Sequence, residues 1–210
     1  MKTITQLVVG MWVMLAACSN GASSKVTAIG ASYKTTSALP AESPFRKQPA
    51  GTVLNFFQWY RNNVNQLKKI KLVDKITVDT VSYYAVNFTA TEQYLAEMKK
   101  SGFVSEEYIR YWRNYFKKRD EDLHKTPQHT GTAKGFDIDF VMLAKEYEED
   151  LSTIEQSTVN SENITNDKGT ITIGLPTVGR LKVTIEKQGD KWMINEIKDL
   201  RSALDQAQND

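Results

Sequence analysis

The apolar residues of this chain change their spacing once along the sequence, and this change constrains the fold more than any other feature. In the first half they recur every three or four positions, as in the stripe of Val53, Phe57 and Tyr60. Near the end they alternate with polar residues, as in Leu181-Lys-Val-Thr-Ile-Glu186. The first spacing is typical of amphipathic helices and the second of half-buried strands. Helices followed by a strand meander predict an α+β fold, with N-terminal helices packed on a C-terminal antiparallel sheet.

Helix start signals occur at three places. Thr52 is expected to cap a helix that continues to Lys69. Thr89 and Glu92 have the spacing of a capping box, which predicts a second helix after Thr89. Ser105 is expected to cap a third helix, because acidic residues follow it in the first turn and complement the helix dipole.

The C-terminal part carries strand signals. Strands are expected over residues 170–175, 181–186 and 192–197, and a hairpin turn over residues 187–191, which contain Gly and Asp. Residues 70–87 are ambiguous, because their partial alternation fits a short strand as well as a loop.

The first residues indicate an export signal. Lys2 precedes an unbroken apolar run from Leu7 to Ala17. This run is shorter than the roughly 20 apolar residues that a membrane span needs. A positive start, a short apolar run and small residues at its end are typical of a secretory signal. We therefore expect residues 1–17 to be a signal peptide.

The only cysteine of the chain follows that run directly. Leu15-Ala16-Ala17-Cys18 resembles the bacterial lipobox, in which the cysteine thiol is lipidated and the signal is cut before it. The alternative is a plain signal with a chance cysteine. Lipidation also removes a lone thiol that could pair wrongly in an oxidising compartment. We expect Cys18 to anchor the protein to a membrane of the cell envelope, and Ser19 after it favours the outer membrane.

The rest of the chain divides by composition. Residues 18–48 are rich in Ser, Ala and Thr and are expected to form the lipidated cysteine and a flexible tether. Residues 49–200 are expected to form a single α+β domain, and residues 201–210 a polar tail. The net charge is +2, and removal of Lys2 with the signal leaves +1. This near-neutral balance gives no basis for a nucleic-acid partner.

Three segments in order carry a resemblance to a known family. They are FFQWY in the first helix, GFDIDFVMLAKEY in the middle, and the closing VTIEKQGDKWMINEIKDL with Trp192, Ile194 and Ile197. The last segment resembles the final hairpin of the cystatin-like, nuclear-transport-factor-two-like superfamily. Together the segments resemble domain-of-unknown-function family 3828, whose members are bacterial envelope proteins, many of them lipoproteins.

The resemblance implies a strongly curved sheet wrapped against helices, often around a cone-shaped pocket. It implies no settled activity, and a fold does not supply one. The family commonly has Asp-Pro-Phe where this chain has Asp139-Phe140-Val141. The local backbone is therefore expected to differ there.

Two carboxylates flank Ile138. In a strand, Asp137 and Asp139 would point to one face, as a catalytic pair or hard-metal ligands require. The alternative is that Asp139 caps a short helix over residues 140–147. We favour the capping role, because a calcium loop would offer more oxygen ligands at regular spacing.

Other catalytic signals are missing from the sequence. His124 and His129 are the only histidines, and no carboxylate–histidine pairing is visible. No serine-hydrolase, zinc-protease or phosphate-loop motif occurs. The acidic run of Glu146, Glu148, Glu149 and Asp150 is most simply a solvated face. We expect no catalytic residues, no metal and no cofactor, and the sequence favours a non-enzymatic protein.

Aromatic residues exceed what one stripe per helix requires. Most of them are expected to form core. Trp59, Tyr60, Tyr111 and Tyr115 are candidates to line a pocket or a protein-binding surface, because Tyr and Trp suit places that are half apolar and half wet.

Three functions remain open. The favoured one is a lipid-anchored envelope protein that binds a ligand, a peptide or a partner protein through a cleft between sheet and helices. The second is an envelope inhibitor or immunity protein that blocks a lytic enzyme. The third is an enzyme that uses the cone-shaped pocket, with Asp137 or Asp139 as acid or base.

Overall fold

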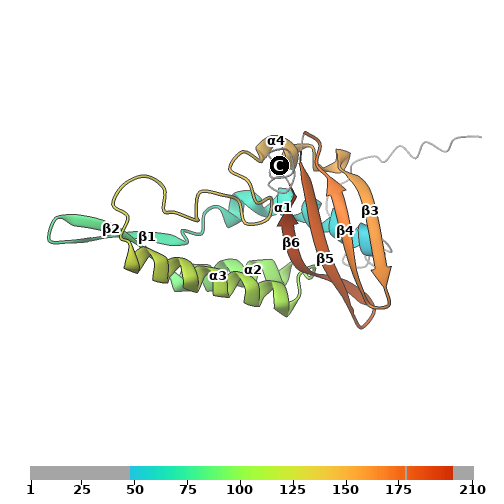
Figure 1. Cartoon of the computed structure of the whole chain (residues 1–210), viewed down its shortest axis with the longest axis horizontal. Coiled ribbons are helices and arrows are strands. Elements are labelled where there is room, and N and C mark those ends of the chain that lie inside the picture. The colour runs from blue at the N-terminus through green and yellow to red at the C-terminus, as the bar shows by residue number, and fades with distance from the viewer. Residues whose placement is uncertain (1–47, 178, 201–210) are drawn as a thin grey trace, which may run out of the picture. The chain divides into compact units, whose positions relative to one another are not determined.

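Helices precede the larger sheet along the chain, as the change of spacing predicts (Figure 1). The computed structural model describes residues 48–177 and 179–200, and this part of the chain has an α+β fold. The predicted signal peptide, Cys18, nearly all of the tether and the tail over residues 201–210 lie outside the described residues.

The first helix, α1 (Pro49–Leu67), begins before the predicted cap. Pro49 opens it, because a proline ring fixes φ at a helical value and the missing N–H has no partner at this position anyway. Thr52 lies inside the helix and its hydroxyl donates to the Gln48 carbonyl at 3.2 Å, so the predicted N-cap at Thr52 is wrong. The predicted stripe is buried, at Val53, Phe56, Phe57, Tyr60, Val64 and Leu67.

The second helix, α2 (Phe88–Lys100), also begins earlier than its predicted capping box. The Asn87 side chain accepts a hydrogen bond from the Ala90 amide at 2.9 Å and is the true N-cap. The capping box of Thr89 and Glu92 is therefore wrong. Glu92 instead accepts two hydrogen bonds from Arg113 of the neighbouring helix, at 2.6 and 2.7 Å.

The third helix, α3 (Glu106–Lys125), packs beside α2 and confirms its predicted start. The Ser105 hydroxyl accepts from the Tyr108 amide at 3.2 Å, as an N-cap does. Glu106 and Glu107 lie in the first turn, where their charge complements the positive end of the helix dipole.

The ambiguous residues 70–87 form a hairpin of β1 (Val73–Val78) and β2 (Val81–Val86). Asp79 and Thr80 form its turn with φ of 47° and 72°, the left-handed values that two-residue hairpin turns prefer. Val86 at the end of β2 donates its N–H to the Asp120 carboxylate of α3 at 3.1 Å. The hairpin extends away from the four-stranded sheet (Figure 1).

The four-stranded sheet is an antiparallel meander in the order β3-β4-β5-β6. Its strands are β3 (Thr158–Thr165), β4 (Lys168–Gly174), β5 (Arg180–Gln188) and β6 (Lys191–Asp199). The last three confirm the predicted strands. β3 was not predicted, because every residue of this edge strand is exposed and no apolar alternation marks it.

Helices and chain segments cover parts of this sheet. α1 contacts β4 and β6, and α3 contacts β6. The outer edge of β6 pairs with the segment before α3, since Ser105 N donates to Ile194 O at 2.9 Å and Ile194 N donates to Phe103 O at 2.8 Å. Trp192 at the start of β6 is only 7% exposed and belongs to the hydrophobic core.

The connection between α3 and β3 contains one short helix, α4 (Glu148–Ser152), and the 3-10 helix η2 (Ile154–Gln156). The predicted solvated acidic face is wrong for Asp150, which is buried. Its carboxylate accepts from the amide and the hydroxyl of Thr177, both at 2.8 Å, and so ties α4 to the loop before β5.

Candidate functional site

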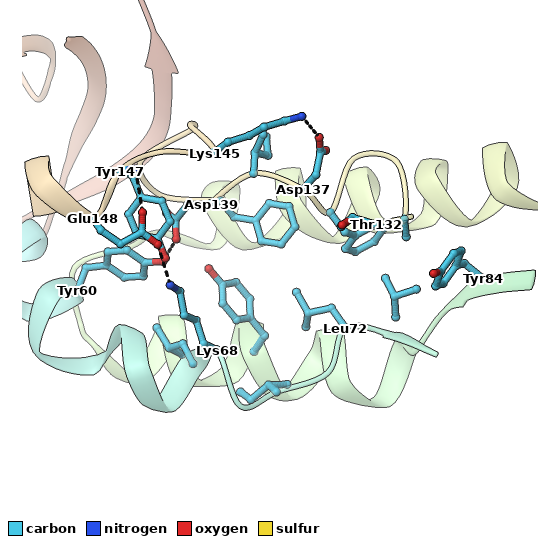
Figure 2. Close-up of a pocket in the computed structure, with 18 residues that line it drawn as sticks. Tyr60, Lys68, Leu72, Tyr84, Thr132, Asp137, Asp139, Lys145, Tyr147 and Glu148 are labelled. Atoms are coloured by element: carbon cyan, nitrogen blue, oxygen red, sulfur yellow. Dashed lines mark hydrogen bonds and ion pairs between the residues drawn. The ribbon is translucent and has the colours of Figure 1, made fainter. Parts of the chain in front are cut away.

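A pocket of about 730 Å³ opens between the end of α1, the hairpin and residues 132–148 (Figure 2). Much of its wall is apolar, formed by Leu67, Ile70, Leu72, Phe136, Ile138 and Phe140. Among the described residues that line it, none belongs to the four-stranded sheet. The pocket therefore lies elsewhere than the sheet–helix cleft that the sequence favoured.

Asp139 holds the turn that forms one side of this pocket. Its Oδ1 accepts hydrogen bonds from the amides of Val141 and Met142, at 2.9 and 2.7 Å. The backbone closes around it, because Leu143 N donates to Asp139 O and Asp139 N donates to Ala144 O, both at 2.9 Å. Asp139 caps backbone amides as predicted, but residues 140–147 form turns, so the predicted helix there is wrong.

The other oxygen of Asp139 accepts a hydrogen bond from the hydroxyl of Tyr60 in α1 (Figure 2). Burial raises the pKa of Asp139, and the hydrogen bonds from Met142, Tyr60 and Val141 oppose that effect. Burial also raises the pKa of Tyr60, and the charge of Asp139 adds to this rise. The pair is therefore a desolvated carboxylate held by a neutral phenol.

A second tyrosine contributes a hydroxyl to the same region. Tyr94 of α2 lines the pocket, is 4% exposed, and its hydroxyl has no hydrogen-bond partner among the described residues. Burial raises its pKa well above the usual value, and the nearby Asp139 charge acts in the same direction. Buried polar groups normally have a partner, so this hydroxyl is an unusual feature of the wall.

Two ion pairs lie at the mouth of the pocket. Lys145 Nζ is 2.6 Å from Asp137 Oδ2, and Lys68 Nζ is 3.3 Å from Glu148 Oε1 (Figure 2). Lys68 Nζ also lies 4.8 Å from the centre of the Tyr147 ring. The hydrogen bond from Lys145 lowers the pKa of Asp137. Exposed pairs of this kind contribute little to stability.

The structure brings together three of the six predicted pocket residues. Tyr60, Asp137 and Asp139 all line the pocket. The two carboxylates do not pair with each other: Asp137 bonds Lys145 and Asp139 bonds Tyr60.

The other three predicted residues lie outside this pocket. Trp59 stacks on Phe56 with ring centres 6.1 Å apart. Tyr111 is 49% exposed on α3 and packs edge-on against Trp112. Tyr115 supports the loop behind the pocket, because its hydroxyl donates to Gly135 O at 2.7 Å.

Several pocket residues were not predicted. Tyr94 is one of the residues on the buried face of α2, and no sequence signal separates it from ordinary core. Lys68, Lys145 and Tyr147 come from separate segments of the chain and meet only in the fold. No spacing rule could have grouped them.

The two histidines lie outside the pocket, and each lies beside a polar group of the fold. His129 Nδ1 lies 2.6 Å from the Ser82 carbonyl, so it donates to the hairpin backbone. Tyr84 of β2 donates in turn to Gly131 O at 2.5 Å. His124 lies 3.4 Å from the Asp120 carboxylate, a pairing that the sequence did not reveal, but the histidine is exposed and outside the pocket.

The site offers carboxylates, ammonium groups and phenols beside apolar side chains. Within the described ranges, no group of three or more His, Cys, Asp or Glu side chains could hold a metal ion. A search of the same ranges finds no helix with the length and apolar character to cross a membrane. No family model, no curated protein and no solved structure matches this chain.

Proposed function

We propose that this chain is a lipid-anchored protein of the cell envelope that binds a small ligand or a peptide segment without converting it. The observation that supports binding is the pocket beside Asp139, which combines apolar walls with a few convergent polar groups. Concave sites of this composition are the usual places for ligands. No nucleic acid is part of this proposal, because the chain is nearly neutral.

The location rests on the sequence. The lipobox-like segment ending at Cys18 supports a lipid anchor, and Ser19 supports the outer membrane. The resemblance to family 3828 supports an envelope protein and, as the finer description of the fold, a cystatin-like sheet of cone shape.

Asp139 is the residue on which an enzymatic alternative would depend. A buried carboxylate with a raised pKa beside a pocket is a common feature of active sites. Both of its oxygens, however, already accept hydrogen bonds from Tyr60 and from two backbone amides. Among the described residues no histidine and no second carboxylate bonds to Asp139 to complete a proton relay, which a general base would use. Binding is therefore the better-supported role.

The exposed face of the hairpin supports a second candidate function, that of an inhibitor or immunity protein. Ile76, Val78 and Val81 are 39%, 52% and 53% exposed. Val78 pairs with Val81 and Ile76 with Tyr83, so all four side chains lie on one face of the hairpin. An exposed apolar face of this kind is typical of protein-binding surfaces.

The test of the binding role is a search for a ligand that co-purifies with the protein. The full chain is purified from an envelope fraction and examined by native mass spectrometry beside Leu72→Trp, which fills the pocket, and Val159→Trp, which adds the same ring on β3. We expect a bound ligand in the wild type and in Val159→Trp and its loss in Leu72→Trp. Equal retention in all three would refute binding in this pocket.

The same preparation tests the anchor. We expect the mature N-terminal peptide to begin at Cys18 and to carry acyl mass. Each buried methylene contributes about 0.8 kcal/mol, so two or more acyl chains hold the protein on a membrane. An unmodified Cys18, or cleavage elsewhere, would contradict the proposed location.

A further inference from the structure

The charges around the pocket do not balance. Three carboxylates line it, from Asp137, Asp139 and Glu148, against two lysines, Lys68 and Lys145. Each lysine forms its ion pair at the mouth, with Glu148 or Asp137. Asp139 accepts only from neutral donors, and in the part of the chain that the structure describes no cationic side chain forms an ion pair with it. One negative charge therefore remains uncompensated inside the pocket.

Aromatic side chains make up much of the same pocket wall. Six rings line the pocket, from Tyr60, Tyr84, Tyr94, Phe136, Phe140 and Tyr147. The face of an aromatic ring attracts cations, most strongly where water is excluded. The wall already accommodates one ammonium group, because Lys68 Nζ lies 4.8 Å from the centre of the Tyr147 ring (Figure 2).

The Tyr94 hydroxyl, which has no partner among the described residues, adds a hydrogen-bond acceptor for a cation to the pocket wall. A phenolic oxygen can accept a hydrogen bond from an ammonium N–H, and this one is not committed to any described residue. Burial raises the pKa of Tyr94 and of Tyr147, and the charge of Asp139 adds to both rises.

We infer that the pocket takes a protonated amine carried on an apolar body. The cation is directed at Asp139 and the aromatic rings of the wall, and the carbon body packs against Leu67, Ile70 and Leu72. This inference rests on the proposed binding role and names the class of its ligand. A half-buried carboxylate attracts a cation and repels an anion. A neutral analogue gains only the apolar contact.

Three probes of matched size separate these contributions. They are phenethylammonium, phenethyl alcohol and hydrocinnamate, which carry a cation, a neutral hydroxyl and an anion on the same phenyl body. Binding to the purified full chain at pH 7 is measured by calorimetry. A cation–ring contact with a nearby carboxylate predicts about tenfold tighter binding of phenethylammonium than of phenethyl alcohol, with hydrocinnamate weakest.

Two variants and one control assign that preference to the pocket. Asp139→Asn keeps an acceptor oxygen but removes the charge, and it should abolish the tenfold preference. Glu162→Gln removes one negative charge from the exposed edge strand β3 and should keep it. Tyr94→Phe removes only a partnerless hydroxyl, so it should fold normally and weaken phenethylammonium binding severalfold. This variant keeps the test valid if Asp139→Asn does not fold.

The possible results distinguish failure of the amine ligand class from failure of the proposed binding role. A preference that disappears in Asp139→Asn and persists in Glu162→Gln supports the amine site. Equal or tighter binding of the alcohol or the acid overturns the ligand class, as does a preference that survives both Asp139→Asn and Tyr94→Phe. Absence of binding by all three probes also overturns it. The proposed binding role then stands or falls separately, on the loss of the co-purified ligand in Leu72→Trp.

Discussion

Replacing Asp139 with alanine should lower the free energy of unfolding by about 3 kcal/mol, because three donors lose their acceptor. The donors are the amides of Val141 and Met142 and the hydroxyl of Tyr60. A buried donor without a partner costs about 1–3 kcal/mol. We take the lower end, about 1 kcal/mol each, because the pocket is open and water can reach part of the turn.

Asp139→Asn is the matched control for this change. Its side-chain oxygen can still accept from the two amides, and its NH₂ group can donate to the Tyr60 hydroxyl. Asparagine caps backbone amides about as well as aspartate, so this variant should stay within about 1 kcal/mol of the wild type.

Both variants are measured by urea unfolding at pH 7, followed by tryptophan fluorescence and extrapolated to water. An alanine variant within about 1 kcal/mol of the wild type would refute the hydrogen-bond argument. An asparagine variant as damaging as alanine would show that the charge, and not the acceptor geometry, holds the turn.

Three further predictions concern the pH response, the last hairpin and a helix start. Burial raises the pKa of Asp139 in the folded state above its ordinary value of 3.8, so the protonation-linked part of its stabilisation is complete below that value and is lost as the pH rises through the folded pKa. Asp139→Asn does not titrate there, so urea melts from pH 4 upward should show this variant gaining stability relative to the wild type. Trp192→Ala should cost about 3–5 kcal/mol in the same assay, and a chain truncated before Lys187 should show no cooperative thermal unfolding. Asn87→Ala should cost about 1 kcal/mol, whereas Thr89→Ala should stay within about 0.5 kcal/mol, and the reverse order would restore the capping box.

The order of helices and strands was predictable because it depends on apolar spacing, which the sequence displays directly. The exact helix starts were not. Pro49 lies close to Thr52 and Asn87 close to Thr89, so each segment carries more than one start signal. The edge strand β3 was missed for a physical reason: an exposed strand gains its stability from backbone pairing with β4, which leaves no pattern in its side chains.

The candidate site was predictable only in part. Asp139 was identified as an acceptor of backbone amides, because that role depends on nearby residues alone. Its bond to Tyr60 joins segments far apart in the chain, and no local rule predicts it. The same holds for Tyr94, because only the folded structure shows that its hydroxyl has no partner among the described residues.

The hairpin wall has a consequence for the timing of ligand exchange. Among the described strands, β1 and β2 pair only with each other, and a two-stranded hairpin is marginally stable by itself. Two hydrogen bonds tie its strands to the adjoining loop, one from Tyr84 to Gly131 O and one from His129 to Ser82 O. Local opening of such an element needs less free energy than global unfolding. Opening of the hairpin removes one wall of the pocket, so a bound ligand should leave faster from the opened state. A disulfide across the hairpin should therefore lengthen the residence time of the ligand.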